Sequence, residues 1–184
     1  MTSREATISI IAALESMQVP YMVVGSLSSN VYGIARSTQD ANVVVQVGDT
    51  TIVELAQLLG PRFKLNPQMS FETVTGTMRF VFVVEKVPFK IELFLLSDDA
   101  HDQSRFARRV RVSVMDRECW VASPEDVVVT KLRWMRKKDR EDVENVIRVR
   151  QGKLDWPYIE QWCDRHGTRE LLEKIRREVA KLEG

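Results

Sequence analysis

Three oxygen-bearing side chains, Asp40, Asn42 and Glu92, stand where short apolar stretches indicate β-strands. Residues two apart on a strand point to the same face, so Asp40 and Asn42 project together from the start of one strand. Glu92 lies in the otherwise apolar run 91–94, where a carboxylate must be paired, bound to a metal or on an exposed face. If the two strands are neighbours, the three side chains form one cluster of hard oxygen ligands, which suits Mg²⁺ or Mn²⁺.

Gly25 and Ser26 follow a short apolar strand and begin a run with helical character. Glycine lets the backbone approach a ligand closely, and Ser26 adds a hydroxyl group at the start of the helix. The first amides of a helix bind phosphate oxygens. A metal site beside such a turn is what phosphoryl or nucleotidyl transfer requires.

The elements that must position these residues follow from hydrophobic periodicity and turn signals. Gly33 is expected to end the helix that starts at Ser26 in a left-handed conformation, and Gly76-Thr77 indicates a hairpin turn. Up to residue 122 the pattern predicts helices over 4–17, 26–32 and 51–59, and strands over 21–24, 41–47, 71–75, 78–84, 87–96, 106–114 and 118–121.

The pattern changes at Ser123, which is followed by Pro124 and two acidic residues. This is a strong start signal for a helix. The connections after it are short, so this part is expected to pack back on the first. We therefore predict an α+β fold: a mixed β-sheet core over residues 1–122 with flanking helices, and a helical module over residues 123–184. The helices of the module are expected over 124–137, 139–150, 156–165 and 168–182.

Composition restricts the class of protein. The chain has 184 residues, of which 44% are hydrophobic and 29% charged, values typical of a globular protein with a real core. A formal net charge of +1 argues against a general nucleic-acid coat or a membrane-surface protein. Two distant cysteines and the absence of a long apolar run or a signal peptide indicate a cytoplasmic protein with free thiols and no membrane partner.

The order of motifs resembles the polymerase-β-type nucleotidyltransferases, over about residues 20 to 150. The closest resemblance is to the minimal and abortive-infection-toxin-like branch. Its motifs are strand-Gly25-Ser26, the segment Arg36-x-Thr38-x-Asp40-x-Asn42, the later strand carboxylate Glu92, Ser123-Pro124-Glu125-Asp126 with Lys131, and Lys138-Asp139-x-x-Asp142.

The resemblance implies roles for individual residues. Asp40, Asn42 and Glu92 occupy the metal-binding positions of the family, and Asp40 and Glu92 would also be catalytic. Lys131 would reach the triphosphate as a catalytic and nucleotide-binding residue. Gly25, Ser26 and Arg36 would also bind the nucleotide. Asn42 stands where the family usually has a second acid, which leaves a one-metal or an inactive site open.

Each of these residues has a simpler interpretation. Asp40 would be a turn acid, and Glu92 an exposed residue that shares its face with Lys90. Lys131 would lay its stem along the core with its amine at the surface. Further alternatives are that Arg36 and Thr38 stabilise a loop, that Asp139 caps a helix, that Asp142 pairs with Lys138, and that His101 and His166 are surface residues.

The predicted function is metal-dependent transfer of a nucleotidyl group from a nucleoside triphosphate to a hydroxyl of RNA, a protein or a small molecule. Eleven basic and five acidic residues give residues 105–140 a net charge of +6, which suits RNA or a triphosphate, or a solvated helix face. The alternative is a catalytically weakened nucleotide-binding protein, or a toxin–antitoxin-type interaction protein with a cognate antitoxin.

Overall fold

The computed structural model describes residues 1–182, without the side chains of residues 49 and 50. At its centre, β1 (Tyr21–Val24) pairs antiparallel with β2 (Asp40–Val45), and β2 pairs parallel with β6 (Lys90–Leu95). The sheet order is β3-β5-β6-β2-β1-β8-β7, with β4 beside β5. The other strands are β3 (Phe63–Leu65), β4 (Ser70–Glu72), β5 (Thr77–Val84), β7 (Val110–Val114) and β8 (Arg117–Val121).

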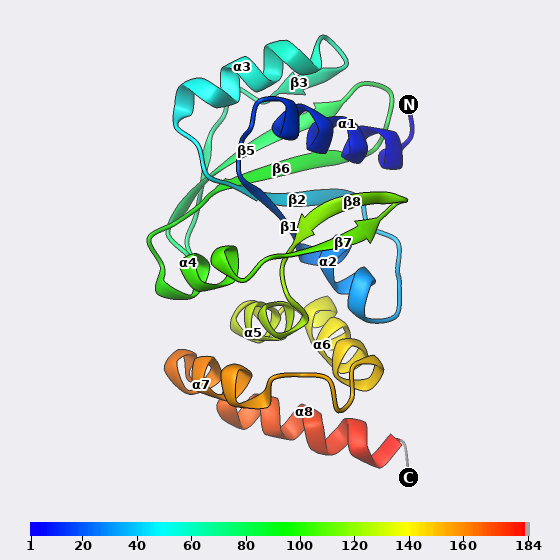
Figure 1. The fold of residues 1–184 in the computed structure, drawn as a ribbon, viewed down its shortest axis with the longest axis vertical. Helices are drawn as coiled ribbons and strands as arrows, with labels where there is room; N and C mark the ends of the chain where they lie inside the picture. Colours follow the sequence, from blue (N-terminus) through cyan, green and yellow to red (C-terminus); the bar gives the residue numbers. More distant parts are fainter. Residues whose placement is uncertain (183–184) are drawn as a thin grey trace.

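Helices flank the sheet on both sides (Figure 1). α1 (Ser3–Ser16) and α3 (Asp49–Leu59) contact each other on one side. α2 (Gly25–Tyr32) and α4 (Ala100–Ala107) lie on the other side, between the sheet and the C-terminal helices. Those helices are α5 (Pro124–Trp134), α6 (Lys137–Val149), α7 (Trp156–His166) and α8 (Arg169–Leu182).

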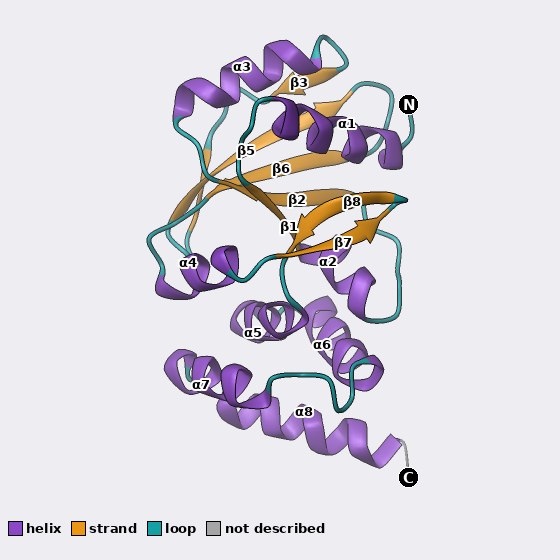
Figure 2. Ribbon diagram, viewed as in Figure 1, coloured by secondary structure: helices purple, strands orange, loops and turns teal. Residues whose placement is uncertain are grey.

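The C-terminal helices form their own layer, which Figure 2 shows as the wholly helical end of the molecule. α5 contacts α6 and α7, and α8 contacts α6 and α7. α2 contacts both α5 and α6, so the short helix after β1 joins the sheet to this layer. A division of the chain at residue 122 stays a prediction.

The core forms where the central strands are covered on both sides. All four residues of β1 are buried, as the unbroken apolar run indicates for a central strand. Ile10 and Leu14 of α1, with Ile52 and Leu55 of α3, are at most 1% exposed. The helix periodicity therefore gives each of these helices one apolar face against the sheet.

The α+β fold with its mixed sheet is confirmed, and so is a hairpin between β4 and β5. The bounds of the hairpin differ from the prediction: the strand predicted over 71–75 ends at Glu72, the turn covers 73–76, and Thr77 already belongs to β5. The strand predicted over 106–114 is wrong in its first residues, which end α4; the strand begins at Val110. Helix α4 was missed because it begins with polar residues, and its start is set by Asp99, which accepts hydrogen bonds from the amides of His101 and Asp102. Strand β3 was also missed.

Two helix ends differ from expectation. Gly33 has φ −122° and ψ −152°, so it leaves α2 in an extended and not a left-handed conformation. The helix predicted over 124–137 stops earlier, at Trp134, because Met135 takes a left-handed conformation with φ +48°. A new helix, α6, then starts at Lys137.

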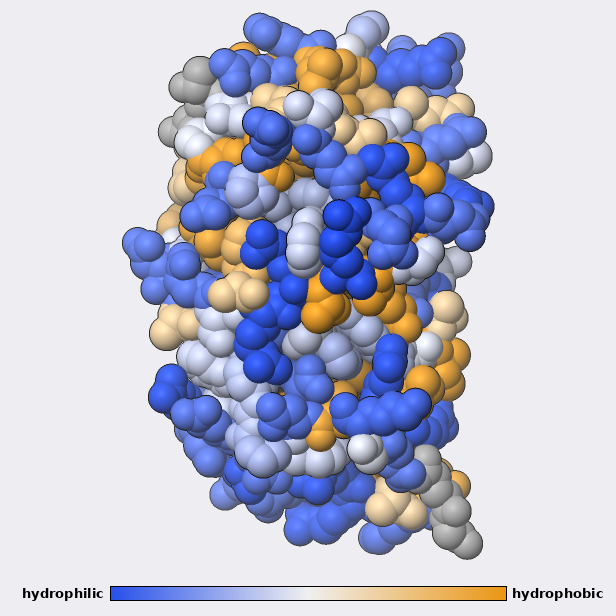
Figure 3. All heavy atoms as spheres, in the orientation of Figure 1, coloured by the Kyte–Doolittle hydropathy of each residue, from blue (hydrophilic) through white to orange (hydrophobic). Residues whose placement is uncertain are grey.

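No helix among residues 1–182 is long and apolar enough to cross a membrane. Both cysteines, Cys119 and Cys163, are free and buried. On the face drawn in Figure 3, polar and charged residues cover most of the surface, with smaller apolar patches between them.

Candidate functional site

Strands β2 and β6 bring together the three side chains that were predicted to cluster. In the parallel ladder Asn42 lies beside Glu92, and Asp40 lies beside Lys90. Asp40, Asn42 and Glu92 all line one cleft between the sheet and helices α4 and α5, which we call the central cleft. The space between these residues is about 840 Å³ with the open solvent at its mouth included.

Gly25 forms the wall of the central cleft next to Asn42. Its φ is +68°, and a Cβ atom at this position would lie 2.6 Å from Nδ2 of Asn42. Both facts favour glycine here, because other residues are strained at this φ and the Asn42 side chain would have to shift. The Asn42 Oδ1 atom is buried and has no hydrogen-bond partner among the described residues.

Glu92 is only 6% exposed, so it is not the exposed-face residue of the simpler interpretation. Its Oε1 atom lies 2.7 Å from Nζ of Lys90, its neighbour on the same strand face, and 3.6 Å from Nη1 of Arg79 on β5. Burial of this carboxylate is therefore compensated by two cations at the rim of the cleft.

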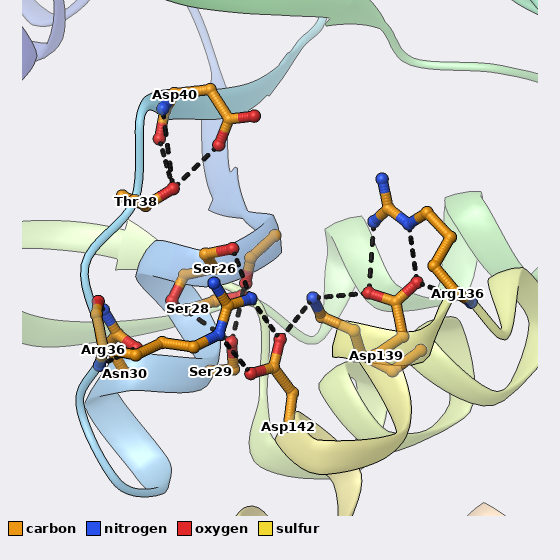
Figure 4. A network of polar contacts seen from close by, with 12 residues as sticks. Ser26, Ser28, Ser29, Asn30, Arg36, Thr38, Asp40, Arg136, Asp139 and Asp142 are labelled. Carbon is orange, nitrogen blue, oxygen red and sulfur yellow. Dashed lines mark hydrogen bonds and ion pairs between the residues drawn. The ribbon is translucent and has the colours of Figure 1, made fainter. Parts of the chain in front are cut away.

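Asp40 has the fewest polar partners among the carboxylates that line the central cleft. Its Oδ1 atom accepts a hydrogen bond of 2.8 Å from the hydroxyl of Thr38, as Figure 4 shows. Within the described part of the chain it has no ion pair at 4 Å or less, whereas Glu92, Asp102 and Asp126 each have at least one.

These donors fit one hard cation. Two carboxylates and an amide oxygen without a hydrogen-bond partner among the described residues line the same cleft from the paired strands β2 and β6, and oxygen is the ligand that Mg²⁺ prefers. No group of three or more His, Cys, Asp or Glu side chains that could hold a metal occurs among the described residues. The oxygen donors that a cation could use here are Asp40, Glu92 and the amide of Asn42, with one negative charge fewer than three acids would carry.

Helix α2 starts at Gly25 with its N-terminus towards the cleft, and no side chain in the described structure caps it. Ser28, which lines the cleft, donates to the carbonyl oxygen of Gly25. Ser26 is 4% exposed, and its hydroxyl accepts a hydrogen bond of 2.9 Å from Arg36. Ser26 and Arg36 are not among the residues that line the central cleft. Their role in nucleotide binding stays a prediction.

Lys131 takes part in a buried ion network instead of exposing its amine. Its Nζ atom lies 2.9 Å from Oδ1 of Asp139 and 2.7 Å from Oδ2 of Asp142. Arg36 adds a bidentate pair with Asp142, at 2.8 and 2.9 Å, and Arg136 binds Asp139 (Figure 4). The surface position considered for the Lys131 amine is therefore wrong: it joins α5 to α6, while Arg36 joins α6 to the core.

The pKa values of Asp139 and Asp142 reflect this network. Burial alone would raise both pKa values, but hydrogen bonds and attraction from the neighbouring cations outweigh it and lower them. For Asp142 the cations are Arg36 and Lys131, so the expected pair with Lys138 does not occur. Asp139 caps α6 as expected, by accepting a hydrogen bond from the amide of Arg136.

Asp126 at the start of α5 is fully buried and organises a second network. It accepts hydrogen bonds from Tyr158 at 2.7 Å and Ser123 at 2.7 Å, and lies 3.0 Å from Nε2 of His101. These bonds outweigh burial and lower the pKa of Asp126. His101 is 2% exposed, so its interpretation as a surface residue is wrong. His166 is partly buried and lies in ring contact with His101.

Sequence reasoning missed several residues of the central cleft. They belong to β5, which pairs with β6, and to the turn before it, and to the end of α5 and the N-cap of α6, so they reach the cleft only through tertiary pairing. The alternation of Arg79 between apolar neighbours was the available signal. The missed residues include Thr75, Thr77, Arg79, Trp134 and Arg136.

The parallel pairing of β2 with β6, beside the glycine turn after β1, matches the arrangement implied by the order of motifs. Together with the helical layer on the far side of the cleft, it agrees with the nucleotidyltransferase fold that the resemblance predicted. Residues 5–181 match the family described as "Nucleotidyltransferase of unknown function (DUF6036)", and the chain belongs to this family.

Solved structures share this fold at low sequence identity. The antibiotic-resistance factor ANT(2'')-Ia is 15% identical, with a TM-score of 0.51 over 98% of this chain and 94% of that one. The lincosamide antibiotic adenylyltransferase LnuA, bound to lincomycin, is 14% identical, with a TM-score of 0.51 over 77% and 94%. An antigenic nucleotidyltransferase-like protein from Paracoccidioides brasiliensis is 13% identical, with a TM-score of 0.52 over 92% and 90%. No curated protein matches the chain.

Proposed function

We propose that this chain transfers a nucleotidyl group from a nucleoside triphosphate to a hydroxyl acceptor, in the central cleft. The observation that carries the proposal is the convergence of Gly25, Asp40, Asn42 and Glu92 on that cleft, beside the uncapped start of α2. These are a phosphate-binding helix end and a set of oxygen ligands, which together serve nucleotidyl transfer.

In this reaction the acceptor oxygen bonds to the α-phosphorus of the triphosphate. The bond from that phosphorus to the oxygen that bridges to the β-phosphate breaks, and pyrophosphate leaves with the electron pair. The acceptor's proton goes to the carboxylate of Asp40, whose only described side-chain partner is the Thr38 hydroxyl. The amides at the start of α2 hold phosphate oxygens, and Gly25 allows them to come close.

A divalent ion would be held by the carboxylates of Asp40 and Glu92 and by the amide oxygen of Asn42. Mg²⁺, or Mn²⁺, supplies positive charge to phosphate oxygens when it is bound. The unpartnered Oδ1 of Asn42 supports this ligand role, because a buried acceptor without a partner is costly unless a ligand satisfies it.

The acceptor is a hydroxyl group, of a small molecule, an RNA or a protein. Two proteins of similar fold are described by their action on antibiotics: LnuA as a lincosamide antibiotic adenylyltransferase, and ANT(2'')-Ia as an antibiotic-resistance factor. They support a small molecule as the first acceptor class to test. The basic stretch 105–140 supports including RNA in the same screen.

The test is transfer of label from α-³²P-labelled nucleoside triphosphates to panels of hydroxyl compounds, RNA and protein, with Mg²⁺ or Mn²⁺. Asp40→Asn should reduce transfer at least about 100-fold, because it removes both a ligand and the proton acceptor. The matched control is Asp98→Asn, since Asp98 is exposed and does not line the cleft. Transfer that Asp40→Asn leaves unchanged would overturn the proposal.

A second candidate is nucleotide binding without turnover. The amide at Asn42 and the ion pair between Glu92 and Lys90 favour it, because both reduce the negative charge available to cations. It predicts that nucleotide raises the Tm while no acceptor is labelled with any metal. A cognate antitoxin, as in toxin–antitoxin systems, stays a prediction from the family resemblance and is tested by co-purification.

A further inference from the structure

The ion pair of Lys90 involves Glu92, which is one of the proposed metal ligands. Lys90 sits two residues before Glu92 on β6 and directly beside Asp40 in the ladder with β2. Its Nζ atom is 2.7 Å from Oε1 of Glu92. The side chain of Lys90 is 49% exposed whereas that of Glu92 is 8% exposed, so the ammonium comes from the solvent side onto a buried carboxylate.

Lys90 is not among the residues that line the central cleft, and it reaches Glu92 from the solvent side. Of the cations that do line the cleft, Arg79 also lies beside Glu92, and the other three pair with other carboxylates. Lys131 is held by two carboxylates, Arg105 by Asp102, and Arg136 by Asp139. Among the described residues Lys90 has a single carboxylate partner, and an ammonium group carries three N–H donors. Lys90 therefore keeps donors for phosphate oxygens after it has bound Glu92.

The formal charges of the site explain why a lysine belongs there. A site with three carboxylates and two divalent ions carries a net charge of +1. Here Asn42 removes one negative charge, and Lys90 adds one positive charge. Two carboxylates, the Lys90 ammonium and one divalent ion sum to +1, and the guanidinium of Arg79 beside Glu92 adds a further positive charge. A single ion therefore gives a net charge no lower than that of the two-ion site.

We propose that Lys90 replaces the second metal ion of a three-acid site, so that the nucleotide complex of this protein holds one divalent cation. The inference rests on the proposed nucleotidyl transfer and assigns a further residue to it. Arg79, at 3.6 Å from the same Glu92 oxygen and anchored by a 2.9 Å hydrogen bond to Ser70, holds the carboxylate from within the cleft. Lys90 holds it from the solvent side, where its remaining N–H donors would meet phosphate oxygens at the mouth of the cleft.

The first experiment counts bound Mn²⁺ by electron paramagnetic resonance, in the presence of a triphosphate whose α,β-bridging oxygen is replaced by a methylene group. The native chain should bind one Mn²⁺ per nucleotide complex. The double variant Asn42→Asp with Lys90→Gln restores three acids and removes the ammonium, and it should bind two. Lys64→Gln, an exposed lysine on β3 outside the cleft, is the matched control and should bind one.

The second experiment measures transfer. Lys90→Gln should lower kcat about 100-fold, as loss of a preorganised charge at a transferring phosphate does, while the Kd for the nucleotide changes much less. Lys90→Arg should recover part of kcat, because it retains the charge. Circular dichroism and the Tm check that each variant is folded.

The outcomes separate this inference from the proposed function. A native chain that binds no nucleotide overturns both. A native chain that binds the nucleotide with two Mn²⁺ ions, or a folded double variant that still binds one, overturns the role of Lys90 alone. The role of Lys90 is also overturned if Lys90→Gln raises both the Mn²⁺ affinity and kcat, because that result would show that Lys90 competes with the metal for Glu92.

Discussion

Replacing Lys131 with methionine should destabilise the fold, because it leaves two buried carboxylates with one cation fewer. Lys131, Asp139 and Asp142 have side-chain exposures of 5%, 0% and 3%, so solvent screens their interactions little. Removing one partner of a buried ion pair costs about 3–5 kcal/mol. Arg36 and Arg136 still face the carboxylates, which places the expected loss near the lower end, about 3 kcal/mol.

For a chain of this length, about 3 kcal/mol corresponds to a fall in Tm of about 6–12 °C. The free energy of unfolding is measured by urea denaturation followed by circular dichroism, with Lys138→Met as the control. Lys138 is exposed on the next helix, and its replacement should change stability by no more than about 0.5 kcal/mol. Asp142→Asn should cost less in the Lys131→Met background than in the native chain, because the two side chains are in contact.

The same variant carries a pH prediction. The folded pKa values of Asp139 and Asp142 lie below their ordinary values, so their contribution to stability is present above the unfolded pKa of about 4 and is lost as the pH falls through the folded pKa. Without Lys131 the folded pKa values rise, and acid unfolding should begin at a higher pH. The reasoning is refuted if Lys131→Met keeps native stability and instead loses nucleotide affinity, since the amine would then serve the triphosphate.

Two more predictions concern the glycine turn and the histidine beside the second network. Gly25→Ala should lower the free energy of unfolding, measured by urea denaturation, by about 3 kcal/mol and weaken nucleotide binding, because it adds a collision with Asn42 to the strain of a positive φ. The control is Gly76→Ala, at φ +70° with open space around it, which should lower the free energy of unfolding by about 1 kcal/mol. Equal losses for the two variants would show that the collision is relieved. Burial, followed by the charge of Arg133, lowers the pKa of His166 in the folded chain to about 4. As the pH falls, the unfolded chain therefore protonates this histidine before the folded chain does, and stability should fall as the pH drops from about 6.5 to about 4. His166→Gln should flatten the Tm in that pH range, and an unchanged slope would contradict this.

Local patterns in the sequence were enough to predict most elements. The unbroken apolar run of β1 and the Ser-Pro-acid start of α5 are decided within a few residues, by burial and by capping. These two elements can therefore be predicted from the sequence alone. Helix α4 was not predicted, because its residues show no clear apolar period and its start depends on a side-chain cap at Asp99.

Within the site, the sequence by itself determined which residue types were available: the turn at Gly25, the ligands Asp40 and Asn42, and the isolated acid Glu92. Tertiary structure alone decided their partners. The register of β2 with β6 places Asn42 beside Glu92, and long-range packing of α5 and α6 buries Lys131 between two carboxylates. The physical reason is that a charged side chain takes its role from the charges and the solvent around it, and these come from segments far apart in the chain.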